Sequence, residues 1–228
     1  MVSEKVCIGL DGKDQVSAIL AGPGLAAETN RTGLIVAHGA GNDMNNPLIV
    51  AVAERLSSAG YVTLRFNFPY KEKGKKSPDS QKKLVHAWQS VYDYMKQNER
   101  FPVDRIIAVG KSMGARVASQ IVAEGQMDVA ALIFLGYPLH FPGKKDQLRD
   151  AHLYQINMPM LFFAGTKDPW CDLTKLNTVL NNLRCPHDLE IIDGGNHSFK
   201  LPKSANRSEG AVNSQIQERC VAWLGQLE

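Results

Sequence analysis

The sequence has few of the features that mark binding to metals, nucleic acids or membranes. Its four cysteines are scattered, with no CxxC pair and no His/Cys group at the spacing of zinc ligands. The net charge of +3 is too small to indicate nucleic-acid binding, and neither a basic helix nor an aromatic stacking motif is present. No apolar run approaches the length of a membrane span. We therefore expect no metal site, no nucleic-acid partner and no membrane insertion.

The composition also bears on the compartment. The sequence begins MVSEKVCIGLDGKD, a mixed and charged stretch that predicts no secretory signal. The hydrophobic content of 44% and the charged content of 21% are typical of a soluble globular protein. Scattered cysteines favour reduced thiols over a disulfide framework. These features together predict a reduced, cytoplasmic protein, and they leave its oligomeric state open.

The order of the elements predicts the fold class. Strand-like runs alternate with helical patterns from residue 34 onward, which indicates a mostly parallel sheet wrapped by helices on both faces. Before them, Glu4–Leu10 and Gln15–Ala21 predict an antiparallel edge joined by the turn Asp11-Gly-Lys. With no internal repeat and no linker, we expect one doubly wound α/β domain over residues 1–228. The remaining predicted strands are Gly33–Ala37, Tyr61–Phe68, Arg105–Val109, Val129–Leu135, Met160–Ala164 and Asp188–Ile192, and the predicted helices include Pro47–Ala59, Ala115–Ala123, Leu173–Leu183 and Glu209–Leu227.

The stretch VGKSMGARVA has two interpretations. Its letters GKS could end a phosphate-binding P-loop, but that motif needs a glycine where Arg105 stands, and the run before GKS is an apolar strand. The letters GKSMG also fit G-x-S-x-G, the sharp strand-to-helix turn that exposes a nucleophilic serine. A strand entering the turn directly favours this second interpretation, with Ser112 as the nucleophile.

Four loops that follow predicted strands carry residues suited to acyl transfer. They are His38-Gly-Ala-Gly-Asn, the turn at Ser112, Gly165-Thr-Lys-Asp168 and Gly194-Gly-Asn-His197. Loops at the carboxyl ends of parallel strands share one edge of the sheet, so these residues should meet there. The chain order Ser, Asp, His is also that of an α/β-hydrolase.

Each residue type has a physical role in this chemistry. A serine hydroxyl needs a base to take its proton as it attacks, and His197 is the expected base. Asp168 is expected to hold the imidazole in the correct tautomer, with Asp172 and Asp193 as alternatives. His38 is expected to brace its own turn by hydrogen bonding. The backbone N–H groups of Ala40 and Met113 would stabilise the oxyanion; Gly39, Gly41 and Trp170 are expected near the substrate.

The motifs HGAG, GKSMG, GTKDP and GGNHSF together resemble the α/β-hydrolase superfamily, in particular its lidless dienelactone-hydrolase-like branch. The stretches TLRFNFPY, GYPLHFPGK and FFAGTKDPW are similar to a subgroup that includes the KANL-type and testis-expressed hydrolase-like proteins. The resemblance runs from about Gly33 to Phe199. It implies the same roles for Ser112, Asp168, His197, Ala40 and Met113, without a cofactor. The serine nucleophile departs from the cysteine typical of dienelactone hydrolases themselves.

The loops also predict the shape and charge of the site. The segment between Tyr137 and Met158 is too short for a cap domain, so we expect an open site for a small ester or thioester. Basic residues in three loops could form a rim that draws anionic substrates or partners, or could be solvated loop tips: Lys71, Lys73, Lys75, Lys76, Lys144, Lys145, Arg149, Lys200, Lys203 and Arg207. The alternative function is an interaction module that keeps the fold without useful turnover, and a lyase is a third hypothesis.

Overall fold

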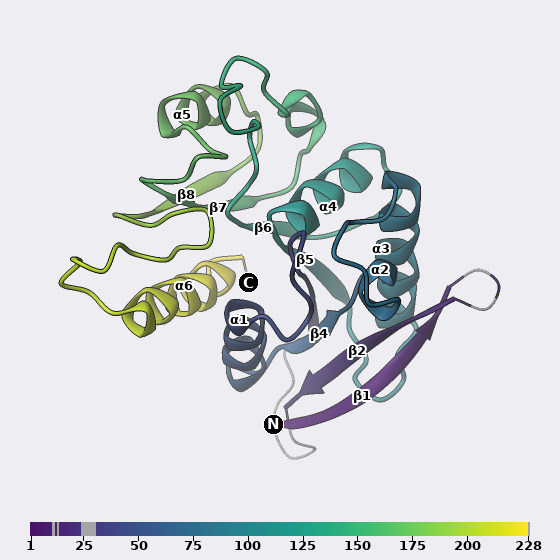
Figure 1. The fold of residues 1–228 in the computed structure, drawn as a ribbon. Helices are drawn as coiled ribbons and strands as arrows, with labels where there is room; N and C mark the ends of the chain where they lie inside the picture. The colour runs from purple at the N-terminus through teal and green to yellow at the C-terminus, as the bar shows by residue number, and fades with distance from the viewer. Residues whose placement is uncertain (11, 13, 24–30, 228) are drawn as a thin grey trace.

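The computed structural model describes residues 1–10, 12, 14–23 and 31–227, and it contains an eight-stranded sheet (Figure 1). The spatial order is β1-β2-β4-β3-β5-β6-β7-β8, with antiparallel pairing at β1–β2 and β2–β4 and parallel pairing elsewhere. The strands are β1 Val2–Gly9, β2 Gln15–Gly22, β3 Thr32–Ala37, β4 Val62–Phe66, β5 Arg105–Lys111, β6 Ala131–Leu135, β7 Met160–Gly165 and β8 His187–Ile192. The predicted mostly parallel sheet with an antiparallel N-terminal edge is confirmed.

Helices cover both faces of the sheet (Figure 1). Helices α1 (Pro47–Ser58) and α6 (Glu209–Leu224) pack on one face. On the other lie α3 (Gln81–Lys96), α4 (Met113–Ala123) and α5 (Leu173–Asn181). The arrangement is the doubly wound one that alternating strands and helices predict.

Strand β3 shows why the sequence folds into these three layers. Its side chains alternate between the two faces, as those of any strand do. Leu34 and Val36 join the core under α1 and α6, whereas Ile35 and Ala37 join the core under α3 and α4. A strand that is apolar at every position is therefore buried on both sides, in the centre of the sheet.

Two short helices depart from the expectations. Helix α2 (Pro69–Glu72) follows β4, where no helix was predicted, and a 3-10 helix, η1 (Ala151–Gln155), lies between β6 and β7. Strand β4 ends at Phe66, short of the predicted Phe68, because the Phe68 N–H donates to the His38 ring at 3.1 Å and Pro69 opens a helix. The predicted turn at Asp11-Gly-Lys falls partly outside the described residues.

The segment between β6 and β7 bears on access to the carboxyl edge of the sheet. Within residues 136–159, all of which the structure describes, the only helix is the 3-10 turn η1. The expected absence of a cap domain is confirmed. Among the described residues, no helix combines the length and the apolar character needed to cross a bilayer.

Candidate active site

Ser112 lies at a strained turn between β5 and α4. Its φ of 51° falls in the left-handed region, which non-glycine residues rarely occupy and which is found at functional turns. Strand and helix cross so closely here that a Cβ on Gly110 would lie 2.3 Å from the Ala115 nitrogen. A Cβ on Gly114 would lie 2.8 Å from the His38 oxygen. The glycines of GKSMG are thus required by packing, as the G-x-S-x-G interpretation predicts.

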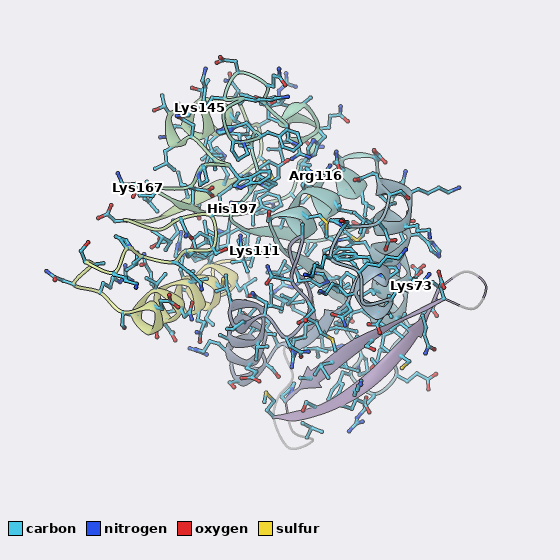
Figure 2. All side chains as sticks on the ribbon, in the orientation of Figure 1. Lys73, Lys111, Arg116, Lys145, Lys167 and His197 are labelled. Carbon is cyan, nitrogen blue, oxygen red and sulfur yellow. The ribbon has the colours of Figure 1, made fainter. Side chains whose placement is uncertain are left out.

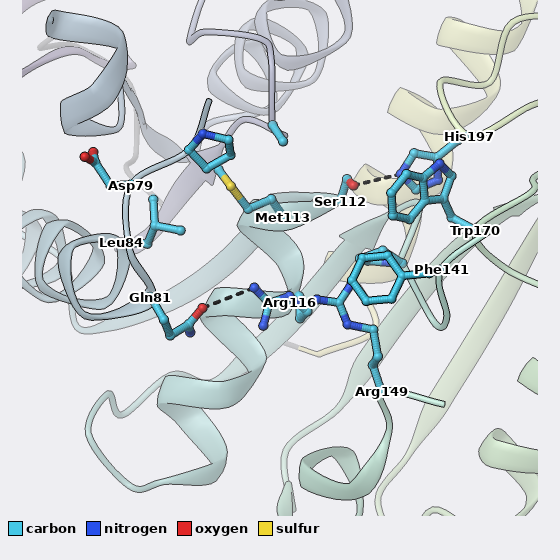
Figure 3. A pocket seen from close by; sticks show the side chains of 13 residues that line it. Asp79, Gln81, Leu84, Ser112, Met113, Arg116, Phe141, Arg149, Trp170 and His197 are labelled. Carbon is cyan, nitrogen blue, oxygen red and sulfur yellow. Dashed lines mark hydrogen bonds between the residues drawn. The ribbon is translucent and has the colours of Figure 1, made fainter. Parts of the chain in front are cut away.

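The structure brings Ser112, His197 and Asp168 together from three loops. Oγ of Ser112 lies 2.7 Å from Nε2 of His197 (Figure 3). Nδ1 of His197 lies 2.8 Å from Oδ2 of Asp168. With a proton on Nδ1 directed at the carboxylate, Nε2 is left as the acceptor for the serine proton. This is the geometry of a nucleophile, a base and a group that orients the base.

The two alternative acids do other work. Asp172 caps α5 by accepting from the N–H groups of Thr174 and Lys175. Asp193 accepts from the Thr166 hydroxyl at 3.2 Å. The Asp168 side chain is fully buried, and its second oxygen accepts from the Trp170 N–H at 2.8 Å. Of these three acids, Asp168 is the one in contact with His197.

Lys111, the first variable residue of G-x-S-x-G, is buried, and Figure 2 shows it close to His197. Its ammonium donates to the His197 backbone oxygen at 2.5 Å and sits over the Phe199 ring. Burial lowers the pKa of Lys111 to about 8, and the charge of Asp168 opposes that shift. Burial also lowers the pKa of His197; the Asp168 hydrogen bond raises it, and the positive charge of Lys111 lowers it further. A neutral imidazole is thereby favoured, as a base requires.

The predicted oxyanion donors border the same site. Ala40 and Met113 both line the pocket beside Ser112. Met113 is the first residue of α4, where N–H groups lack intrahelical acceptors. The Ala40 N–H has no acceptor among the described residues. The neighbours Gly39 and Gly41 do not line the pocket; Gly41 instead supplies the turn with its φ of 76°.

His38 braces the glycine-rich turn, as expected. It is fully buried, its Nδ1 donates to the Gly39 oxygen at 2.8 Å, and its Nε2 accepts from the Phe68 N–H. Burial lowers the pKa of His38 to about 4, which keeps the ring neutral. With both nitrogens engaged, His38 is a structural element of the loop that carries Ala40.

A pocket of about 400 Å³ opens beside Ser112 (Figure 3). The Trp170 ring forms one wall, with its centroid 5.6 Å from that of His197 and 5.8 Å from that of Phe141. Arg116 and Arg149 also line the pocket. A predominantly apolar hollow with a few polar groups is typical of small-molecule sites.

The basic residues of the three loops do not lie together around the pocket. Lys73 pairs with Asp14 at 2.9 Å and Lys145 pairs with Asp172 at 2.6 Å, and both lie toward the outside of the molecule (Figure 2). Of the ten basic residues considered for the rim, Arg149 is the one that lines the pocket of Ser112. No three potential metal-ligating side chains gather within the described part of the chain.

The family model described as "Alpha/beta hydrolase domain" matches residues 30–225. The chain belongs to this family. Among solved structures, it is similar to an alpha-beta serine hydrolase homologue from Coxiella burnetii, with 22% identity, 98% of each chain covered and a TM-score of 0.76. A dienelactone hydrolase from Anabaena variabilis has 21% identity and a TM-score of 0.76, with 99% of this chain and 97% of that chain covered.

A third relative bears on the missing cap. The protein XC6422 from Xanthomonas campestris, described as a serine hydrolase without lid, has 20% identity and a TM-score of 0.71. The match covers 98% of this chain and 96% of that chain. The α/β-hydrolase fold, including its lidless form, is therefore established for this chain.

Two residues of this hydrolase domain, Lys111 and Arg116, were missed in the sequence, and Arg149 was expected only as part of a basic rim. Lys111 occupies a variable position of its motif, and its burial depends on Phe199, which is distant in the chain. Arg116 and Arg149 come from α4 and from the segment before η1. Charge alone could have marked Arg116, because it is the one charged residue of helix α4.

Proposed function

We propose that this chain is a serine hydrolase that cleaves a carboxylic ester or thioester through an acyl-enzyme. The observation that carries the proposal is the contact of the Ser112 hydroxyl with His197 Nε2 at 2.7 Å, inside a pocket large enough for a small substrate. Backbone N–H groups of Ala40 and Met113 support it as the oxyanion donors. No cofactor is needed for this chemistry.

The reaction has two halves. Ser112 Oγ forms a bond to the substrate carbonyl carbon while its proton passes to His197 Nε2, and the oxyanion is stabilised by the two N–H groups. The bond to the leaving oxygen or sulfur then breaks, and His197 gives that atom its proton. In the second half, water loses a proton to His197 and attacks the acyl carbon. The Ser112 bond breaks, the proton returns to Oγ, and the carboxylic acid leaves.

A fluorophosphonate probe tests this proposal directly. We expect wild type to gain the mass of one adduct, and we expect Ser112→Ala to gain none. Matched ester and thioester substrates would then separate the two substrate classes by kcat/KM. An absence of adduct on folded wild type would contradict an activated serine and favour the interaction-module hypothesis.

The proposal extends to the compartment and the number of domains. We place the protein in a reducing, cytoplasmic setting as one domain; its free cysteines, including the exposed Cys7, support the former, and its continuous eight-stranded sheet supports the latter. The resemblance to the KANL-type and testis-expressed subgroup rests on the sequence stretches above and stays a prediction.

A further inference from the structure

Two arginines line the pocket of Ser112, and neither forms an ion pair with a carboxylate of a described residue. The Arg116 guanidinium donates to the side-chain oxygens of Gln120 and Gln81, at 2.7 and 3.1 Å, and both acceptors are neutral. The Arg149 guanidinium has no hydrogen bond or ion pair with any described residue, and it lies over the Phe141 ring at 4.4 Å. Both side chains are half-buried. Two cations that share a partly desolvated pocket repel each other, and a protein with no use for them would pair or expose them.

The Arg149 backbone is fixed on both sides. Its N–H donates to the Leu139 oxygen at 2.8 Å, and its oxygen accepts from the Tyr137 hydroxyl at 2.8 Å. The same hydroxyl lies 3.1 Å from the His152 ring, which in turn contacts Ser119 of α4. The loop that carries Arg149 is thereby tied to the helix that carries Arg116. Preorganised donors of this kind bind a ligand without the cost of ordering them.

One acidic residue, Asp79, also lines the pocket. The Asp79 carboxylate has a buried oxygen with no partner among the described residues, and it forms no ion pair with either arginine. In Figure 3 it lies at the opposite end of the pocket from Arg149. The positive charge is therefore concentrated at the Arg116–Arg149 end.

The two sides of Ser112 would bind different parts of a substrate, the leaving group and the acyl portion. His197 protonates the leaving group, so the leaving group must lie on the His197 and Trp170 side of Ser112. Figure 3 shows Arg116 with Gln81 on the other side of Ser112. Arg116 therefore faces the acyl portion. Arg149 lies over Phe141, whose ring packs against Trp170, and its charge acts on Arg116, so its guanidinium lies between the two sides.

We propose that Arg116 and Arg149 form a carboxylate-binding subsite, and that the substrate is an ester or thioester whose acyl chain ends in a second carboxylate. This inference rests on the proposed hydrolase function. Guanidinium groups suit the task because their fork of N–H donors matches the two oxygens of a carboxylate. The subsite makes Arg116 and Arg149 specificity determinants, with no part in the proton transfers.

A matched pair of esters tests the subsite. The anionic substrate is the mono-4-nitrophenyl ester of adipic acid, and the neutral one carries a carbamoyl group in place of the free carboxylate. Because the leaving group is the same, a difference in kcat/KM reports recognition of the acyl end. We expect wild type to prefer the anionic ester by about tenfold to a hundredfold, the effect of one or two charge-assisted hydrogen bonds.

Variants assign the preference to the arginines. We expect the preference to fall close to one in Arg149→Gln and in Arg116→Gln, with folding checked by circular dichroism. Arg184→Gln is the matched control, since this exposed arginine precedes β8, at the amino ends of the parallel strands and away from the site. It should keep the wild-type preference. A wild-type preference of one or less would overturn the subsite, as would a preference that survives both pocket variants.

Calorimetry with adipate separates failure of the subsite from failure of the hydrolase. If neither ester is cleaved, the proposed reaction is wrong. Adipate binding to wild type that is lost in Arg149→Gln would still support the subsite, whereas no binding to wild type would overturn it too.

Discussion

A single ammonium group distinguishes His197, the proposed base, from an ordinary exposed histidine. Lys111 supports the His197 backbone through its hydrogen bond, and its charge disfavours a second positive charge on the imidazole. The two effects act on the same residue but have different signatures. The first fixes position and the second fixes the pH at which His197 is neutral.

Lys111→Met should move the acid limb of the pH profile. Loss of the positive charge raises the pKa of His197, so His197 stays protonated to higher pH and kcat/KM at mildly acidic pH falls. The charge-dependent part of the difference should fade at higher pH, where His197 is neutral in both proteins. The measurement is kcat/KM for a neutral ester against pH.

The exposed Lys167 provides the control for that experiment. Lys167→Met removes a positive charge close to Asp168 in the chain, but solvent screens it. Its acid limb should coincide with that of wild type. A Lys111→Met profile that is lowered equally at every pH would mean that Lys111 acts through position alone.

A second prediction at the residue scale concerns Asp168. Asp168→Asn should lower kcat by roughly 10⁴-fold, because an amide cannot hold the same tautomer of His197. Asp172→Asn should instead leave the unfolding free energy within about 0.5 kcal/mol of wild type, because the asparagine side-chain oxygen can cap α5 in the same way, with kcat near wild type. Ester kinetics and urea unfolding on both variants separate the roles. Equal kinetic losses in the two variants would contradict the assignment of the acid to Asp168.

Among the secondary-structure elements, the crossing of β5 and α4 controls the site most directly. A methyl group on Gly110 would overlap the backbone of Ala115, so Gly110→Ala forces the strand and the helix apart. We expect a loss of about 1–3 kcal/mol in unfolding free energy, together with a lower kcat as Ser112 moves.

Urea unfolding and ester hydrolysis test this prediction against Gly9→Ala. A Cβ on Gly9, in the edge strand β1, would meet nothing within 4 Å. That variant should stay within about 0.5 kcal/mol of wild type. A Gly110→Ala protein as stable and active as the control would contradict the prediction. It would mean that β5 and α4 can admit a methyl group without a loss of stability or activity.

The elements also explain which features could be predicted from the sequence. Fully apolar strands and the loops after them follow from local patterns, so the order of Ser112, Asp168 and His197 along the chain indicated their common edge. Helix α2 was missed because four residues leave no periodicity to detect. The meeting of Arg116 with Arg149 depends on how the segment from Tyr137 to η1 runs over α4. Its hydrogen bonds join residues far apart in the chain, so no local pattern reports it.

For the molecule as a whole, the two layers of helices and the sheet leave the carboxyl edge without a cap. The core is divided into two clusters by the sheet, and both clusters stabilise the strands whose ends carry the site. Rigid support and open access therefore occur together. Binding selectivity must then come from side chains in the pocket wall, such as Trp170 and Arg149, because no domain closes over the substrate.

The uncapped edge also affects which molecule, water or an alcohol, accepts the acyl group. An acyl-enzyme at Ser112 would remain in contact with bulk solvent, so any small alcohol dissolved there competes with water as the acceptor. We expect added methanol to divert product from the free acid to the methyl ester in proportion to its concentration, as measured by chromatography of the products. A product ratio that ignores methanol would indicate a selective water site. In mixed solvents, this hydrolase would be a transesterification catalyst whose product is set by the medium.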